Sequence, residues 1–290
     1  MKKSLKTRNI TVLLLTTIIL FLSCSKEDTT DVGTETTAEE VISATELKVS
    51  DEAELISEEV TTIAEDVYEA DEISTVSKVF YRSGYLPDCA IVTTILTDTT
   101  KEKTIDFGEG CELPNGNILS GVIFLSYAKD MEMATKTIAL SLIDFTFNGV
   151  AVEGNASVVR TRENTNGNPQ SDAVASFSGL WPDDSTASFT GNRTREWIAG
   201  YGSGFWGDNV FLISGMGTYT GKLGNVFSKE IITPLRKEAA CRFIVSGVLE
   251  ISRNDATASL DFGDGSCDAT GTLTHPDGTT SEVFLRRFLK

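Results

Sequence analysis

From residue 79 to the end of the chain, apolar and polar residues alternate in short stretches, the pattern of half-buried β-strands. Turn residues separate the stretches. Asn148-Gly149, between two alternating runs, is a strong hairpin signal, and Pro114-Asn115-Gly116 and His275-Pro276-Asp277-Gly278 mark further turns. The alternation recurs at 119–127, 138–142 and 143–147. We expect strands at 174–177, 188–197, 209–216 and 225–232, the last ended by Pro234, and a loop at 164–172.

Ten or more short strands with no internal helical pattern predict an all-β domain over residues 79–290, an antiparallel β-sandwich or a partly closed barrel. Ahead of it, Leu55 or Ile56, Val60, Ile63 and Val67 recur at helical spacing among acidic residues. We expect a short acidic amphipathic helix within residues 39–78, packed by its apolar stripe on the β domain. Residues 24–38 are polar and acidic, which predicts a solvated tether.

One unit occurs twice in the β domain, at about 89–127 and 241–285. Each copy has a cysteine, a strand, a turn, a second strand ending Asp-Phe-Gly-acid-Gly, a second cysteine and a further hairpin. Two copies are too few for a solenoid or propeller, which needs at least about three repeats. We therefore expect two similar hairpins within one sheet system.

The cysteines of the two units fit hairpin geometry. Facing residues of an antiparallel hairpin have position numbers of constant sum, so pairing Cys89 with Cys111 centres a turn on Thr100. Pairing Cys241 with Cys267 centres the other turn on Asn254, and both centres fall among turn-forming residues. We predict these two disulfides, each worth about 3 kcal/mol in the chain-entropy model. Zinc is the alternative, but the chain has one histidine and no Cys-x-x-Cys spacing.

The N-terminus has the layout of a signal peptide over residues 1–23, with four basic residues before an apolar run from Ile10 to Leu22. Its end, Phe21-Leu22-Ser23-Cys24, resembles the lipobox of bacterial lipoproteins, although Phe21 stands where leucine is usual. The resemblance implies acylation of Cys24 and anchoring in a membrane. Ser25-Lys26-Glu27-Asp28 resembles the export signal of Bacteroidota surface lipoproteins, which implies the outer face of the outer membrane. An ordinary cleaved signal with a chance cysteine is the alternative.

Together with the duplicated Asp-Phe-Gly-acid-Gly units, the stretches Arg193-Thr-Arg-Glu-Trp-Ile-Ala-Gly200 and Cys241-Arg-Phe-Ile-Val-Ser-Gly247 resemble a family of Bacteroidota outer-membrane and surface lipoproteins. The resemblance covers most of residues 79–284. It implies the lipid anchor and an all-β ectodomain, and it implies no activity, substrate or catalytic residue.

The net charge of the chain and its distribution argue against one class of function, nucleic-acid binding. The formal net charge is −17, and 17 acidic but only three basic residues lie between Cys24 and Lys78. With no basic stripe to neutralise phosphates, we do not expect nucleic-acid binding. We also expect no cofactor and no metal. Asp261, Asp264 and Asp268 are close in sequence, as are Asp183 and Asp184, but neither set has the spacing of a calcium loop.

Catalytic signatures are sparse. His275 lies in a turn, and no nucleophile elbow, phosphate-binding loop or zinc-protease motif occurs. A carboxylate pair such as Asp106 and Asp261 is the remaining route to hydrolysis of glycosides. Strand alternation places both on the face opposite their apolar neighbours, so we expect them to face solvent or cap turns. We therefore assign no catalytic residue.

Two stretches in the middle are candidates for binding. In a strand, Arg193, Arg195 and Trp197 share one face, either as a structural ladder or as the wall of a groove. The Gly-rich loop that follows presents aromatic rings able to stack on sugars or enter a protein interface. The predicted ligand-binding residues are Tyr201, Phe205 and Trp206 of this loop, with Trp181 as a neighbour. The alternative is that these rings cover an open end of the core.

The leading interpretation is a lipid-anchored envelope protein with a non-enzymatic ectodomain that binds glycan or protein. A carbohydrate-active hydrolase with paired carboxylates and a purely structural envelope protein are the alternatives. Exposed aromatic rings would favour glycan binding, whereas two facing carboxylates in a cleft would favour the hydrolase.

Overall fold

One long helix is followed by a meander of antiparallel strands in the computed structural model, which describes residues 44–77, 85–221 and 224–284. The helix α1 spans Ala44–Ser77. The strands are β1 (Ile91–Leu96), β2 (Thr100–Asp106), β3 (Cys111–Glu112), β4 (Ile118–Ala128), β5 (Thr135–Phe147), β6 (Val150–Thr161), β7 (Gln170–Leu180), β8 (Thr186–Ala199), β9 (Val210–Thr220), β10 (Val226–Glu238), β11 (Ile244–Arg253), β12 (Ala256–Asp264), β13 (Thr270–Thr274) and β14 (Thr280–Phe284).

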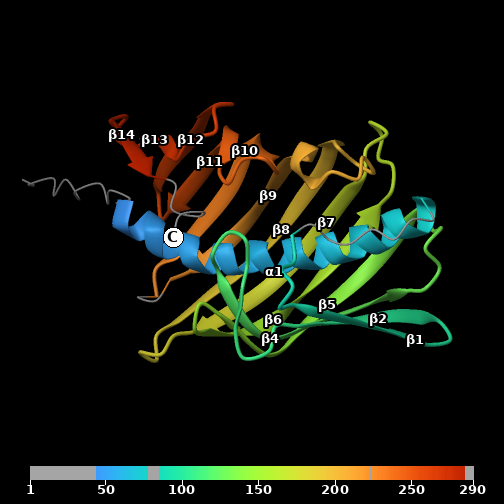
Figure 1. Cartoon of the computed structure of the whole chain (residues 1–290). Coiled ribbons are helices and arrows are strands. Elements are labelled where there is room, and N and C mark those ends of the chain that lie inside the picture. The colour runs from blue at the N-terminus through green and yellow to red at the C-terminus, as the bar shows by residue number, and fades with distance from the viewer. Residues whose placement is uncertain (1–43, 78–84, 222–223, 285–290) are drawn as a thin grey trace, which may run out of the picture. The chain divides into compact units, whose positions relative to one another are not determined.

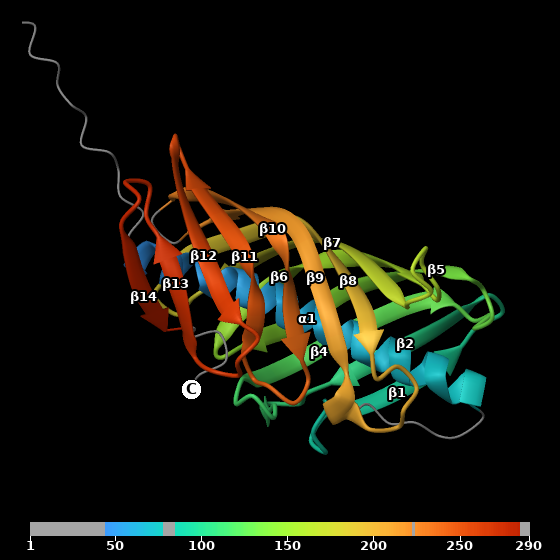
Figure 2. The same cartoon turned by 90° about the horizontal axis from the view of Figure 1, so that it is seen from above.

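The strands form one sheet in chain order, from β1 and β2 through β4 to β14, with the short β3 paired to β4. Every pairing is antiparallel, which confirms the predicted fold class. Among the described strands, β1 and β14 end the order and the sheet stays open. The sheet curves around α1, which lies across its inner face (Figures 1 and 2). Helix and strands belong to one compact unit, residues 38–290.

Local sequence explains several turns. Asn148 and Gly149 adopt φ of +49° and +81° between the facing residues Phe147 and Val150, as the hairpin prediction required. The predicted end of a strand at Pro234 is wrong, because β10 continues to Glu238. Its register with β11 shifts on both sides of this proline. A bulge accommodates proline within a strand because the missing N–H is not needed in the ladder there.

Both predicted disulfides are present, with Cα–Cα distances of 5.6 Å for Cys89–Cys111 and 5.7 Å for Cys241–Cys267. The second hairpin turns at Asn254, within one residue of the prediction. The first does not have the predicted register, because Ile91 faces Asp106 and the turn is centred between Asp98 and Thr99. Gly108, at φ +60°, bends the chain between β2 and Cys111, and this bend accounts for the difference.

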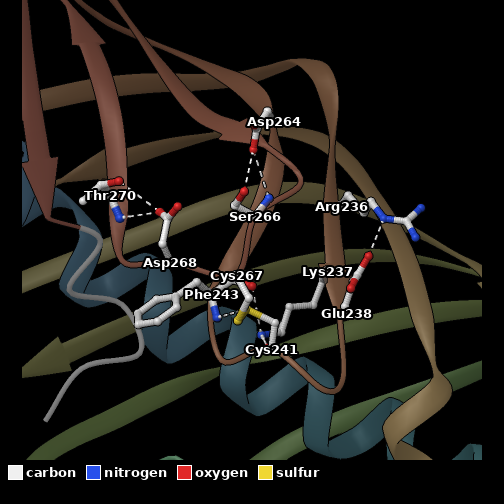
Figure 3. Close-up of a disulfide and its surroundings, with 10 residues drawn as sticks. All are labelled: Arg236, Lys237, Glu238, Cys241, Phe243, Asp264, Ser266, Cys267, Asp268 and Thr270. Atoms are coloured by element: carbon white, nitrogen blue, oxygen red, sulfur yellow. Dashed lines mark hydrogen bonds and ion pairs between the residues drawn. A yellow bond between two sulfur atoms is a disulfide. The ribbon is translucent and has the colours of Figure 1, made fainter.

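Figure 3 shows the second disulfide beside Lys237, whose ammonium donates to the carbonyl of Cys241 at 2.6 Å. Burial lowers the pKa of Lys237 to about 8. The hydrogen bond from Lys237 holds the segment between β10 and β11, where Cys241 begins the second repeated unit and forms its disulfide with Cys267.

The helix prediction is confirmed by α1 and by the burial of its apolar residues Ile56, Val60, Ile63 and Val67. These pack with inward-facing side chains of β2 and β4 to β7 in one core cluster. A second cluster lies under β9 to β13 and includes Cys241. Among the described residues, no helix combines the length and the apolar character needed to cross a membrane. The predicted signal peptide, Cys24 and the tether lie outside the described residues.

Candidate functional site

The inner face of the sheet carries a row of cations that the sequence analysis did not connect with α1. Lys229 of β10 lies 2.5 Å from Glu54, and Arg195 of β8 lies 2.6 Å from Glu65. Lys103 of β2 lies 3.0 Å from Asp71. Helix carboxylates and sheet cations therefore pair along α1, from its N-terminal half to its last turns.

The most enclosed of these pairs centres on Arg160 of β6, which is 2% exposed. Its guanidinium donates to Glu72 at 2.9 and 3.2 Å, to Glu69 at 3.0 Å and to Ser171 at 3.3 Å. Glu72 also accepts the hydroxyl of Tyr201 at 3.1 Å. Buried charges of this kind are tolerated only when paired and hydrogen-bonded, so this network fixes how α1 sits on the sheet.

Burial and pairing move the pKa values in opposite directions along the helix. Loss of hydration raises the pKa of Glu69 to about 7, and its neighbours Arg195 and Arg160 offset only part of this effect. Burial alone would also raise the pKa of Glu65, but Arg193 and Arg195 outweigh it and hold that pKa below its usual range. Glu65 is thus fixed as a carboxylate, whereas Glu69 takes up a proton near neutral pH.

Arg193, Arg195 and Trp197 share one face of β8, as predicted, and that face looks inward. Trp197 packs with Phe211 and Ile73 in a small buried cluster, and the guanidinium of Arg195 stacks 3.7 Å from the centre of the Phe211 ring. The three side chains belong to the helix-sheet contact. This is the structural ladder, with α1 as the partner that the sequence pattern did not reveal.

The aromatic loop, residues 200–209, connects β8 to β9 and is ordered by its own hydrogen bonds. Ser203 donates to the Asp208 carboxylate at 2.9 Å and accepts the backbone N–H of Phe205 at 3.1 Å. Gly200 adopts φ +87°, and a Cβ there would lie 2.7 Å from the Asp208 carbonyl oxygen, so the loop requires glycine at its start. Phe205 is 67% exposed on this fixed loop.

The other predicted aromatic residues are placed differently from Phe205. Trp206 is half-buried and stacks on Tyr85 with ring centres 6.3 Å apart. Tyr201 packs edge-on against Trp197, and burial together with Glu72 raises its pKa to about 12. Trp181 lies in the turn after β7, at the opposite end of β8 from the aromatic loop. The structure therefore brings together Tyr201, Phe205 and Trp206 but not Trp181, and only Phe205 is displayed fully to solvent.

A second feature lies on the outer face of β8 to β11, where a hollow of about 330 Å³ is open to solvent. Its outward side chains are mostly hydroxyls and amides, with Glu230 and Glu250 among them. These two glutamates face each other directly across β10 and β11. Like charges in directly facing positions weaken a sheet, so the stability of the β10–β11 pair does not explain why two glutamates stand there. The other non-glycine residues that line the outer hollow are Thr190, Asn192, Met216, Thr218, Ser228, Lys229 and Ser252.

The inner face has little free space. The cavity between α1 and β7 to β11 measures about 40 Å³, which is far below the roughly 300 Å³ or more of small-molecule sites. Helix side chains and their paired cations fill the concavity of the sheet. Among the described residues, the larger open space and the exposed ring of Phe205 lie on the surface, in the outer hollow and on the aromatic loop.

Other candidate chemistry has local structural roles. The Asp106 and Asp261 carboxylates are exposed, as predicted, and accept the N–H groups of Gly108 and Gly263 at 2.8 and 2.9 Å. His275 lies in the turn between β13 and β14, as expected, 3.0 Å from the Ser281 hydroxyl. Among the described residues, no group of three or more histidine, cysteine or acidic side chains is arranged to hold a metal ion.

Comparisons with protein-family models, with curated proteins and with solved structures find no match to this chain. The geometry of the aromatic loop and of the outer hollow is therefore the basis for the functional proposal.

Proposed function

We propose that the chain is a lipoprotein of the bacterial outer membrane, anchored through Cys24 and exposed at the cell surface, whose β domain binds glycan without catalysing a reaction. The anchor is supported by the lipobox-like junction at Cys24. Export is supported by the two disulfides, which persist in oxidising compartments. An envelope protein is the other class of ligand that the loop chemistry suits.

The observation that carries the binding proposal is the display of Phe205 on a loop held by internal hydrogen bonds. Large exposed aromatic rings on rigid loops are frequent anchors of recognition, because they give contact area with little loss of conformational freedom. The neighbouring Tyr201 and the Trp206–Tyr85 stack extend the apolar surface of the loop. The filled inner face directs an extended ligand, such as a polysaccharide, to this surface.

A glycan array with soluble residues 25–290 tests the proposal. Phe205→Ala is the informative variant, because truncating the half-buried Trp206 would also disturb its packing on Tyr85. Phe284→Ala is the matched control, since Phe284 is 68% exposed on β14. We expect wild type and Phe284→Ala to bind alike and Phe205→Ala to bind about 30-fold more weakly, the loss typical of an anchor residue worth about 2 kcal/mol.

Absence of binding to any glycan would remove the glycan proposal and favour the structural envelope protein. Equal binding by Phe205→Ala would remove the aromatic loop as the site. The anchor has a separate test: Cys24→Ala should lose incorporation of labelled fatty acid and leave the membrane fraction. Retention of the label in that variant would refute acylation at Cys24.

The facing pair Glu230 and Glu250 supports a second candidate, a carbohydrate-active hydrolase. Directly facing residues of antiparallel strands have Cβ atoms about 4.5–5.5 Å apart. Retaining glycosidases hold their two carboxyl groups about 5–5.5 Å apart, one as acid and base and the other as nucleophile. Release of reducing sugar from polysaccharides by wild type, abolished in both Glu230→Gln and Glu250→Gln, would establish the hydrolase. Binding without turnover would exclude it.

A further inference from the structure

Among the described strands, β1 forms one open end of the sheet and carries no charge. Its sequence, Ile91-Val-Thr-Thr-Ile-Leu96, has no charge, proline or glycine, and all six residues are exposed. The exposed fractions reach 60% for Ile91, 61% for Ile95 and 67% for Leu96. Edge strands of monomeric proteins are usually protected by charges, prolines or bulges, because an unprotected edge pairs with other chains. The exposure of β1 therefore needs a partner to explain it.

The direction of the free backbone groups follows from the pairing of β1 with β2. The Thr97 N–H donates to the Thr100 carbonyl, and the register from this pair back to Ile91 is uninterrupted. Hydrogen-bonded pairs alternate along an antiparallel ladder, so the odd-numbered residues of β1 bond to β2. Three N–H and three C=O groups, those of Val92, Thr94 and Leu96, point to the open edge.

The strand is complementary to itself about a two-fold axis through Thr94. An antiparallel second copy then places Thr94 opposite Thr94 and Val92 opposite Leu96 of the partner copy. Every open N–H and C=O of the three residues gains a partner, giving six hydrogen bonds across the axis. On the inner face, Val92 then faces Leu96 and Thr94 faces Thr94 of the partner copy. On the outer face, Thr93 faces Ile95.

The other end of the sheet does not offer the same match. Strand β14 (Thr280–Phe284) carries Glu282 at its centre, and a two-fold axis there brings two carboxylates together. Strand β1 itself carries no charged side chain to oppose a second copy of β1. An isologous contact also closes after two copies, whereas pairing β1 with β14 would continue into an open filament.

We propose that the protein self-associates through β1, with two copies joined edge to edge in one continuous antiparallel sheet. A single strand pair is smaller than the roughly 1,600 Å² of a standard interface, so the dimer of the soluble chain is reversible. Anchoring both copies in one membrane raises their effective concentration and favours the pair. The association does not depend on what the aromatic loop binds.

Disulfide trapping of residues 25–290 tests the pairing and its register. In the predicted dimer the two Thr94 Cα atoms lie about 5.5 Å apart, within the range that a disulfide spans. We expect Thr94→Cys to convert to a covalent dimer under mild oxidation. The matched control is Thr99→Cys, an exposed threonine of the same hairpin that lies far from the axis, and it should stay monomeric.

Analytical ultracentrifugation of the chain without added cysteine gives the second measurement. We expect the weight-average mass to rise from one toward two chain masses between about 1 and 100 μM. Leu96→Lys should hold it at one mass with unchanged circular dichroism, because a lysine then faces Val92 of each partner copy. A wild-type chain that stays monomeric over this range overturns the proposal. So does dimerisation that Leu96→Lys leaves unchanged, or equal trapping of Thr94→Cys and Thr99→Cys.

Discussion

Replacing Arg160 by methionine should destabilise the fold strongly, because it removes one partner of a buried charge network and keeps most of the side-chain volume. Glu69 and Glu72 would lose their nearest cation while 5% and 0% of their side chains remain exposed. Breaking a buried pair in this way costs about 3–5 kcal/mol. Globular proteins have only about 5–15 kcal/mol of unfolding free energy, so the loss is a large fraction of the total.

The assay is urea unfolding of residues 25–290 with intact disulfides, followed by tryptophan fluorescence and far-ultraviolet circular dichroism. Arg162→Met is the matched control, since the Arg162 side chain is 26% exposed and meets Glu72 through one contact of 3.4 Å. We expect the control to lose less than about 1 kcal/mol. The Arg160→Met deficit should also be smaller at pH 5 than at pH 8, because Glu69, whose pKa burial raises to about 7, is neutral at pH 5 and then needs no cation.

Two outcomes would refute this reasoning. The free energy of unfolding of Arg160→Met could lie within about 1 kcal/mol of the wild-type value, which would mean that the network does not fix α1 on the sheet. Equal losses in Arg160→Met and Arg162→Met would mean that burial of the pair is not what matters.

Three further predictions concern pH, backbone and covalent structure. The pKa of Glu69 is raised to about 7, so the folded state binds an extra proton and the free energy of unfolding falls as pH rises from about 5 to 8. Urea unfolding at several pH values should show a smaller fall in Glu69→Gln, and an equal fall would contradict this. Gly154→Ala should lower Tm far more than Gly167→Ala, because a Cβ at Gly154 would lie 2.2 Å from the Ser176 carbonyl oxygen, whereas a Cβ at Gly167 would meet open space. Equal Tm shifts of the two variants in calorimetry would contradict the clash. Removing Cys241–Cys267 with two serines should cost about 3 kcal/mol in urea unfolding, and an unchanged midpoint would show that the bond does not constrain the unfolded chain.

The sequence was sufficient for features that local chemistry determines. Asn148-Gly149 specified its hairpin because both residues tolerate positive φ, and constant position sums selected the correct disulfide pairs. The register of the first hairpin was missed because Gly108 inserts a bend that no sum of positions anticipates. The predicted strand end at Pro234 was wrong because β10 contains a bulge there, and a bulge depends on pairing with the neighbouring strand.

The helix-sheet contact could not be predicted from local patterns. Lys101 and Lys103 alternate with polar residues and look like a solvated turn, yet both pair with Asp71. Arg160 is 88 residues from Glu72 in sequence, so no periodicity connects them. The candidate site was predictable in part: the glycines of the aromatic loop indicated a displayed segment, but the separation of Trp181 and the facing of Glu230 with Glu250 depend on strand register.

The placement of α1 has a consequence for the order of folding. Apart from the short β3, which β2 passes over to pair with β4, each strand pairs with its neighbour in the chain, so the meander can add one hairpin at a time with short loop closures. The helix instead meets partners all along the chain, from Tyr85, which is 26 residues from Glu59, to Lys229, which is 175 residues from Glu54. The helix therefore completes its contacts with the sheet only after β10 has formed, although it precedes every strand in the chain.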